Sequence, residues 1–255
     1  MSKEYKFYNR IAKEYGMYDT QHSNTLKEYP GENSEEVFKR LILSFGGKDK
    51  VALDLGCGDG KFTLSIANNF RKVHGIDLSE GLLNAAKEIL SNEAKEKKNI
   101  HFDLQDAENT LFPDNSFDLI YSRRGPIPYK EIWRLLKLEG TFLGIEISEL
   151  DCKDLKMVFG RGQNYGQWNE KHLERDIREF KELGFKVIFE QDYFFTEYYP
   201  NYNDLDQFLK RVPIFEDFNS QKDEEKLSQY ANDNNTSKGI KLLRHKSIIV
   251  VRKAS

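Results

Sequence analysis

Cysteine is scarce in this 255-residue sequence, which contains only Cys57 and Cys152. The two residues are far apart, and neither has another Cys or a His nearby at the spacing of metal ligands. Disulfide-stapled secreted scaffolds and structural zinc sites both need closely spaced sets of such residues. The sequence therefore argues against both classes, and we expect no metal site.

A long hydrophobic run is absent as well. No stretch approaches the ~20 apolar residues of a transmembrane helix, and the charged residues 1–6 do not resemble a secretory signal. The formal net charge of -3 at pH 7 gives no overall attraction to nucleic acid or to an anionic membrane. We therefore expect a cytoplasmic protein without a membrane span, and we do not expect nucleic acid as a partner, although a local basic patch stays compatible with the composition.

The most informative stretch that is present runs from residue 51 to 60 and reads VALDLGCGDG. Its hydrophobic start reaches the acid Asp54, and the glycines Gly56, Gly58 and Gly60 follow at every second position. Glycine adopts positive φ and lets the backbone approach a ligand that a side chain would keep away. The stretch predicts a buried strand that turns into a helix around a bound nucleoside.

Charge indicates which ligand this loop suits. A dinucleotide-binding fingerprint has the spacing G-x-G-x-x-G and offers bare amides to a pyrophosphate. Here the third glycine comes one residue early, and Asp59 inside the loop would repel an anion, as would Asp54 at the end of the strand. Two carboxylates suit a ligand with cationic groups, such as the ammonium and sulfonium of S-adenosylmethionine, better than they suit phosphate.

Residues 54–60 resemble motif I of the class I S-adenosylmethionine-dependent methyltransferases, and further segments match that family in the same order. Residues 72–77 end in Asp77, 23 positions after Asp54, which resembles the acid that accepts both ribose hydroxyls. Residues 101–108 resemble the adenine-binding motif, in which Asp106 would accept from the adenine amino group while the amide of Ala107 meets the ring. Residues 116–122 resemble the strand that ends beneath the methyl donor.

The resemblance implies that S-adenosylmethionine is the cofactor and identifies the residues that hold it. These are Asp54, Gly56, Cys57, Gly58, Gly60, Asp77, Leu78, Asp106, Ala107 and Ser122. Other interpretations of single features stay open at this point: glycine-rich turns with an acid occur in many α/β proteins, Asp59 can be a solvated loop acid, and Cys57 can be a small residue that fills tight space.

Apolar periodicity predicts strands alternating with helices, which indicates a mainly parallel sheet covered on both faces. The family resemblance sharpens this to a Rossmann-like, doubly wound, seven-stranded α/β sheet whose last strand is antiparallel. We expect strands at 51–55, 72–77, 100–103, 117–122, 141–147, 185–191 and 247–252. We expect helices from a cap at Asn33 onward and near 60–69, 80–95, 128–137 and 169–182.

We expect one methyltransferase domain over residues 1–255, in four parts. Residues 1–33 form an N-terminal lid segment, 34–192 the cofactor-binding core, 193–245 an insertion, and 246–255 the last strand. Residues 193–218 contain nine aromatic side chains, which argues against disorder in the insertion. We interpret residues 1–30 and 193–218 as walls of the acceptor pocket, and simple packing of the aromatics onto the core stays open as an alternative.

Catalytic residues are hard to identify from the sequence, because methyl transfer from a sulfonium depends mainly on alignment of the acceptor. The candidates are His22 and Glu146 as bases and Arg123, or its neighbour Arg124, as a ligand for an anionic acceptor. Each can instead have a purely structural or solvated role. The glycine-containing segment 159–168 is either a flexible recognition lid or a packed Ω-loop.

The resemblance is closest to the broad branch that includes quinone and small-metabolite methyltransferases. It implies transfer of a methyl group to a small-molecule acceptor by in-line displacement. Two alternatives stay open. An RNA methyltransferase would need a basic face, and its binding to RNA would depend steeply on salt concentration. A non-catalytic S-adenosylmethionine-binding protein would differ from an enzyme only in a turnover measurement.

Overall fold

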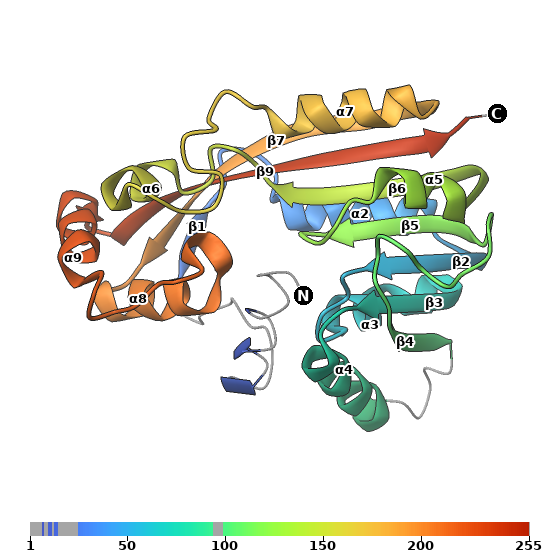
Figure 1. Cartoon of the computed structure of the whole chain (residues 1–255), viewed down its shortest axis with the longest axis horizontal. Helices are drawn as coiled ribbons and strands as arrows, with labels where there is room; N and C mark the ends of the chain where they lie inside the picture. The colour runs from blue at the N-terminus through green and yellow to red at the C-terminus, as the bar shows by residue number, and fades with distance from the viewer. Residues whose placement is uncertain (1–6, 8–9, 12, 15–24, 94–98, 255) are drawn as a thin grey trace.

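The computed structural model describes residues 7, 10–11, 13–14, 25–93 and 99–254. Their centre is one mixed sheet with the strand order β1-β7-β9-β6-β5-β2-β3-β4, and β8 pairs with β9 beside this path (Figure 1). The strands are β1 (Leu26–Glu28), β2 (Gly47–Leu55), β3 (Phe70–Asp77), β4 (Ile100–Leu104), β5 (Phe117–Arg123), β6 (Leu136–Ile147), β7 (Phe185–Tyr199), β8 (Asn235–Thr236) and β9 (Gly239–Lys253).

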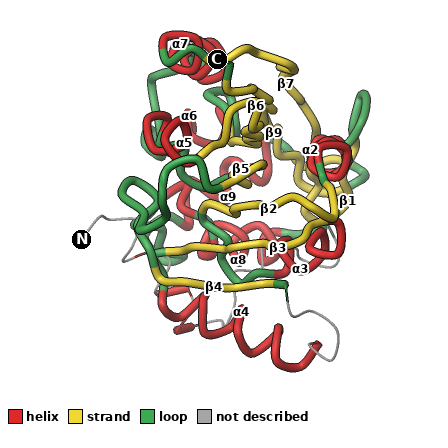
Figure 2. Tube along the Cα trace, turned by 90° about the vertical axis from the view of Figure 1, so that its right-hand side faces the viewer, coloured by secondary structure: helices red, strands yellow, loops and turns green. Residues whose placement is uncertain are grey.

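Helices cover both faces of the sheet. They are α2 (Ser34–Phe45), α3 (Lys61–Ile66), α4 (Glu80–Glu93), α5 (Tyr129–Leu135), α6 (Lys153–Phe159), α7 (His172–Glu182), α8 (Tyr202–Arg211) and α9 (Glu224–Asp233), with short 3-10 helices η1 (Ala67–Asn69) and η2 (Pro213–Phe215). Figure 2 shows α2 and α3 on one side of the strands and α5 on the other. The doubly wound α/β fold predicted from the sequence is confirmed.

The five strands from β2 to β6 pair in parallel, whereas β9 lies antiparallel to both β6 and β7. The seven predicted strands are therefore present, and the antiparallel last strand is confirmed. Two strands were not predicted, the edge strand β1, which pairs with β7, and the two-residue β8. Both are shorter than the four residues at which alternation of polar and apolar side chains is a usable signal.

The sheet separates two apolar clusters. On one face, Val37 and Phe38 of α2 pack with Leu64 of α3 against buried strand residues. On the other face, Ile132 of α5 and Phe180 of α7 pack against a second set. The end of the central strand β2, Val51–Leu55, is buried on both faces and is therefore almost continuously apolar, whereas the edge strand β4 has exposed residues at His101, Asp103 and Leu104.

The largest departure from the expected organisation concerns residues 193–245. Strand β7 continues to Tyr199 and β9 begins at Gly239, so both ends of the expected insertion belong to one long antiparallel hairpin, and only residues 200–238 leave it. The side chains of Tyr193, Phe195 and Tyr199 are buried at alternate positions, which is the period of a strand. Five of the nine aromatic residues that argued against disorder in 193–218 thus belong to a half-buried strand.

The far end of this hairpin has an apolar core of its own. Helices α6, α8 and α9 pack on the hairpin around side chains such as Phe159, Phe208 and Tyr230. Figure 1 shows this extension to one side of the main sheet, joined to it by β7 and β9. The smaller boundary differences are ordinary: α5 ends at Leu135, where β6 begins, instead of continuing to 137.

Two findings concern what the described residues do not contain. None of their helices is both long and apolar enough to cross a membrane. Within the same residues, no group of three or more His, Cys, Asp or Glu side chains is arranged to hold a metal ion. Cys57 and Cys152 are both buried and unpaired.

Candidate functional site

The predicted cofactor residues meet at the carboxyl ends of β2, β3 and β5. Strand register places Asp54 beside Gly75 of β3, and places Leu55 beside Ser122 of β5. Ligands of open α/β sheets bind outside this edge, because loops there diverge to opposite faces and leave a crevice. The topology therefore brings the four sequence motifs to one edge of the sheet.

The loop after β2 adopts positive φ at all three predicted glycines. The values are 75° at Gly56, 54° at Gly58 and 71° at Gly60. A Cβ atom at Gly60 would lie 2.5 Å from Phe102 Cζ, so this glycine permits close packing, whereas a Cβ at Gly58 would have no atom within 4 Å. Gly58 therefore faces open space, where the backbone is accessible to a ligand.

Asp77 at the end of β3 holds the glycine loop in place. Its carboxylate accepts hydrogen bonds from the amide of Gly58 at 2.8 Å and from the amide of Ser79 at 2.8 Å. Burial raises the pKa of Asp77, and these backbone donors oppose the rise. The sequence predicted Asp77 as a ribose ligand but gave no sign of this bond to Gly58. Leu78 next to it is 45% exposed, so its apolar side chain is free to contact a ligand.

Asp54 is buried beneath the same loop. Its carboxylate accepts a 2.6 Å hydrogen bond from the Thr63 hydroxyl of α3. Burial raises the pKa of Asp54 to about 7, although hydrogen bonding lowers it. Asp54 is 2% exposed and Thr63 is fully buried, so the structure places Asp54 beneath the loop and not at the surface of the crevice.

Two further acids of the region lie closer to solvent. The carboxylate of Asp106 is exposed and accepts from the amide of Glu108 at 2.9 Å, in the turn after β4, while Ala107 is buried. The amide of Gln105 donates to the carbonyl of Asp77 at 3.3 Å, which ties this turn to the ribose candidate. Asp59 pairs with Lys61 at 3.3 Å at the start of α3.

The segment after β5 closes tightly over the end of β2. Ser122 is buried, and its hydroxyl lies 3.5 Å from the carbonyl oxygen of Leu55. A Cβ atom at Gly125 would lie 2.7 Å from the same carbonyl oxygen, so only glycine allows this approach. Gly125 was not among the predicted site residues, and the signal that could have identified it is the glycine two residues after the strand.

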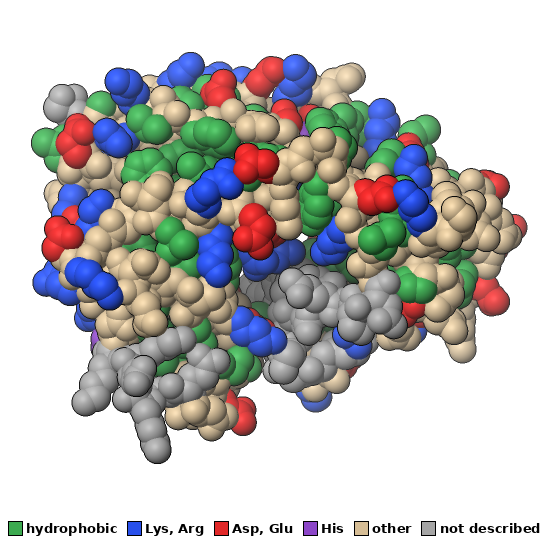
Figure 3. Space-filling model, turned by 180° about the vertical axis from the view of Figure 1, so that it is seen from behind, with side chains coloured by type: hydrophobic (Ala, Val, Ile, Leu, Met, Phe, Trp, Pro, Cys, Tyr) green, Lys and Arg blue, Asp and Glu red, His purple; other side chains and the backbone are tan. Residues whose placement is uncertain are grey.

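Arg123 and Arg124 belong to a basic cluster that also includes Lys246 of β9 and Glu35 of α2. Glu35 accepts a hydrogen bond from Arg123 at 2.7 Å and from Lys246 at 2.6 Å, and Arg124 Nε lies 3.9 Å from it. These cations hold the pKa of Glu35 well below its usual range despite burial. Figure 3 shows Lys and Arg side chains gathered around a hollow near the middle of this side of the molecule. Glu35 and Lys246 were missed because they lie far from Arg123 in the sequence.

Glu146 near the end of β6 lies in a separate buried group. Arg175 Nη2 lies 3.9 Å from its carboxylate, and Asp176 beside it accepts a 2.6 Å hydrogen bond from the hydroxyl of Tyr129. Burial and the neighbouring Asp176 raise the pKa of Glu146 well above its usual value. The surroundings of this carboxyl group therefore favour its protonated form. The other candidate base, His22, lies outside the described residues.

The glycine-containing loop of residues 159–168 is anchored to the extension. The guanidinium of Arg161 donates two 2.8 Å hydrogen bonds to Asp223 and one of 2.6 Å to Asp217. The amide of Gln163 donates to the carbonyl of Ile214 at 2.8 Å. Arg161 and Gln163 thus hold the start of the loop against the extension, whereas residues 164–167 are exposed, and both interpretations of the loop stay predictions.

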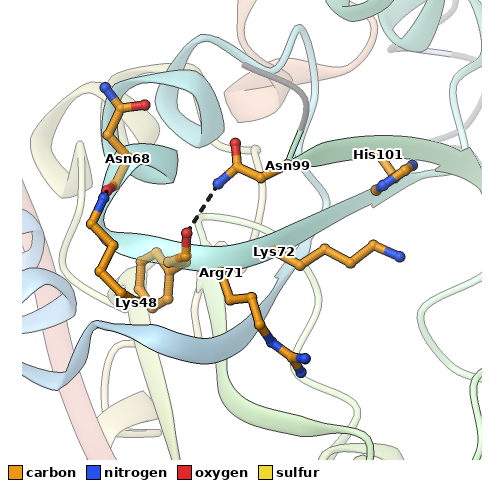
Figure 4. A pocket seen from close by; sticks show the side chains of 7 residues that line it. Lys48, Asn68, Arg71, Lys72, Asn99 and His101 are labelled. Atoms are coloured by element: carbon orange, nitrogen blue, oxygen red, sulfur yellow. Dashed lines mark hydrogen bonds between the residues drawn. The ribbon is translucent and has the colours of Figure 1, made fainter. Parts of the chain in front are cut away.

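A pocket that is open to solvent lies away from this edge. It has a volume of about 730 Å³ and opens near the amino ends of β3 and β4 (Figure 4). Lys48, Arg71, Lys72 and His101 line it, and the side-chain amide of Asn99 donates to the carbonyl of Phe70 at 3.0 Å there. Because the glycine loop and the acids lie at the carboxyl ends of the strands, this pocket is not part of the candidate site.

Comparison with known proteins matches a family model to part of the chain. Residues 52–140 match the model described as a methyltransferase domain. The chain is 35% identical over 164 residues to a demethylmenaquinone methyltransferase of Lactococcus lactis and 32% identical over 135 residues to that of Staphylococcus haemolyticus. These matches cover 54% and 49% of this chain, and 64% and 54% of the two relatives. The chain thus spans less than two thirds of the relatives' length.

Solved structures share the fold at low sequence identity. The YcgJ protein of Bacillus subtilis matches with a TM-score of 0.64 and 18% identity, over 86% of this chain and 99% of that protein. A protein of Bacillus halodurans described as a putative methyltransferase matches with a TM-score of 0.64 and 17% identity, over 88% and 100%. These likenesses confirm the Rossmann-like architecture.

Proposed function

Residues 52–140 belong to the class I S-adenosylmethionine-dependent methyltransferase family, and on this premise we propose that the protein transfers a methyl group from S-adenosylmethionine to a small-molecule acceptor. The demethylmenaquinone methyltransferases among its relatives support an acceptor of this size. A cytoplasmic location stays a prediction from the sequence.

The observation that carries the proposal is the pairing of Gly58 with Asp77. A loop with positive φ, an open position at Gly58 and a carboxylate beneath it form a cradle at the carboxyl edge of the sheet. Each carboxylate oxygen has two acceptor positions, so Asp77 can accept from ribose hydroxyls while it keeps its two amide donors. The residues present fit an uncharged ribose with a cationic methionine group above the acids.

Further contacts follow from where the remaining predicted residues lie. The exposed carboxylate of Asp106 is available to accept from the adenine amino group, and the exposed side chain of Leu78 can cover the adenine ring. Ser122 and Gly125 form the floor of the crevice beside Leu55. The buried charge of Asp54 favours a cation above the loop.

The bound cofactor supplies a methyl group on a good leaving group, so the chain's task is to hold the acceptor in line with it. Alignment of two bound reactants removes translational and rotational entropy from the reaction step, with effective molarities of up to ~10⁵–10⁸ M. A base is needed only if the acceptor must lose a proton. Glu146 stays a candidate for that role, but it would first have to give up the proton that its burial favours.

We propose that the chain is one methyltransferase domain in which the hairpin extension limits the space available to the acceptor. Tyr29, which follows β1, stacks on Phe195 of β7 at 5.1 Å between ring centroids. This contact supports the idea that the N-terminal segment and residues 193–218 together wall the acceptor side. The described aromatic contacts are equally compatible with packing of the extension onto the core.

The test is turnover with the purified protein. Wild type and Asp77→Ala are incubated with S-adenosylmethionine and a panel of small hydroxylated aromatic, quinone and carboxylic acid acceptors, and formation of S-adenosylhomocysteine is followed by mass spectrometry. We expect acceptor-dependent product with wild type and at least tenfold less with the variant. Cofactor binding without turnover on any small acceptor would favour a binding protein, and turnover only on RNA would favour the RNA alternative.

A further inference from the structure

The basic cluster defined above, Glu35, Arg123, Arg124 and Lys246, has more positive than negative charge. Among the described residues, Glu35 is the one carboxylate within ion-pair distance of these three cations. The nearby Arg244 has acidic partners of its own, Asp151 and Glu197. The cluster therefore carries a formal excess of two positive charges.

This excess is partly withdrawn from solvent. Lys246 is only 7% exposed, and burial lowers its pKa to about 8 while Glu35 opposes the change. Arg123 and Arg124 keep about a quarter of their side-chain surface exposed. A buried charge is unfavourable unless an opposite charge compensates it. Three cations around one carboxylate leave room for an anion that no other residue of the described part of the chain provides.

Arg124 adds an independent observation. Its φ is 59°, in the left-handed region that an arginine rarely adopts. Its Nε atom is buried and has no hydrogen-bond partner in the described structure. A guanidinium presents donors in a planar fork that matches a carboxylate or phosphate. The backbone at Arg124 thus places a guanidinium whose Nε atom donates to no acceptor among the described residues.

The cluster lies close to the proposed cofactor loop. Arg123 is the last residue of β5, one position after Ser122, and its guanidinium lies 5.1 Å from the ring centroid of Phe62 in α3. Lys246 pairs in register with Ile147 at the end of β6. The cations therefore sit at the carboxyl edge of the sheet, next to the crevice in which methyl transfer is proposed.

We propose that Arg123, Arg124 and Lys246 bind an anionic group, a carboxylate or a phosphate, of a ligand in the crevice, and that Glu35 positions the three cations. Anion binding by this cluster is argued from its own charge and geometry. Only the identity of the ligand that carries the anion rests on the proposed function. The source is either an anionic acceptor or the carboxylate of the cofactor's methionine part. Both the acceptor and the cofactor would present an anionic group to the three cations. If the acceptor supplies this group, the cluster stays free after the cofactor has bound; if the cofactor supplies it, the cluster is then occupied.

The probe is inorganic phosphate, titrated at low ionic strength and followed by ³¹P nuclear magnetic resonance, with wild type alone and with wild type saturated by S-adenosylhomocysteine. The main variant is Arg124→Asn, because asparagine tolerates positive φ and the change removes a charge without leaving a partner unpaired. Lys246→Gln is the second variant. The matched control is Arg40→Gln, which removes an exposed arginine of α2 paired with Glu32.

We expect wild type and Arg40→Gln to bind phosphate equally, and each cluster variant to bind it at least fivefold more weakly while keeping a wild-type unfolding curve. Binding that persists with S-adenosylhomocysteine present identifies the acceptor as the source of the anion, whereas competition identifies the cofactor carboxylate. No phosphate binding by wild type, or equal binding by Arg124→Asn and Arg40→Gln, would overturn the proposal. Binding of S-adenosylhomocysteine is measured in the same samples, so a failure of the proposed function is seen separately.

Discussion

Two neighbouring regions of the same sheet edge have opposite charge. Around β2 and β3, the buried acids Asp54 and Asp77 lie under a loop of glycines. Around β5 and β9, the cluster of Arg123, Arg124 and Lys246 outnumbers its single acid. Bound ligands with cationic groups on one side and an anionic group on the other would match both regions at once, whether the anion belongs to the acceptor or to the methionine part of the cofactor.

The two regions also differ in what holds them together. The acidic region depends on backbone geometry, namely positive φ at glycines and amide hydrogen bonds to Asp77. The basic region borders a buried network in which Arg244 joins Asp151 to Glu197 across the hairpin extension. Substitutions in the two charged regions should therefore act mainly on ligand binding and local packing, whereas substitutions in the neighbouring Arg244 network should act mainly on the folding of the extension.

The largest expected effect comes from Arg244→Met. It removes the cation that joins the buried Asp151 to the buried Glu197 and leaves Glu197 with Lys27 at 3.2 Å. Loss of one partner of a buried ion pair costs about 3–5 kcal/mol of folding free energy in comparable cases. The measurement is urea unfolding, with Lys238→Met as control because Lys238 forms an exposed pair with Glu28 and should change little. Equal unfolding curves for the two variants would contradict a stabilising role for the network.

A smaller effect on stability is expected for Gly60→Ala. The added methyl would meet Phe102 at 2.5 Å in a residue with φ of 71°, so we expect a loss of about 2–4 kcal/mol from overpacking and backbone strain. Gly58→Ala has the same backbone strain but open space, so about 1–2 kcal/mol is expected. Unfolding curves of both variants give the comparison, and a Gly58 variant at least as destabilised as the Gly60 variant would show that the packing at Phe102 is not decisive.

Cofactor affinity should fall by about 1–3 kcal/mol in Asp77→Ala, through the loss of charge-assisted hydrogen bonds and the release of Gly58. By contrast, Arg40→Gln, which changes an exposed ion pair, should leave affinity unchanged. Calorimetric titration with S-adenosylhomocysteine measures both. If folded Asp77→Ala retained wild-type affinity, the ribose assignment would be wrong.

The smallest expected effect is the release of a fraction of one proton from Asp54 when the cofactor binds. Burial raises the pKa of Asp54 from an ordinary 3.8 to about 7, so its contribution to stability is fully present below pH 3.8 and is lost as the pH rises through about 7. A bound ammonium group favours the ionised carboxylate, so binding near pH 7 should release part of a proton. Titration in two buffers of different ionisation enthalpy measures this release, which should vanish in Asp54→Asn; release that persists would assign it to another group.

The acidic region was predictable because its signals are local. Gly56, Gly58 and Gly60 follow a strand directly, and Asp77 ends the next strand, so spacing alone places them at one edge. The bond from Gly58 to Asp77 could not be predicted, because it depends on the register of β2 against β3. Sequence patterns give strands and their order more readily than they give register.

Only two of the four residues of the basic cluster could be predicted from the sequence. Arg123 and Arg124 stood out as a pair, but Glu35 lies 88 residues before Arg123 and 211 residues before Lys246. Their meeting depends on the antiparallel β9 and on the start of α2, which no local pattern records. The hairpin extension was misread for a related reason, because strong aromatic content obscured the period-two alternation of β7.

The most direct test of the central claim is calorimetric titration of purified wild-type protein with S-adenosylhomocysteine, after mass spectrometry has shown that no cofactor was carried over. The glycine loop, Asp77 and the family relationship predict one site per chain with micromolar affinity. No detectable binding by a folded, cofactor-free sample would contradict the account.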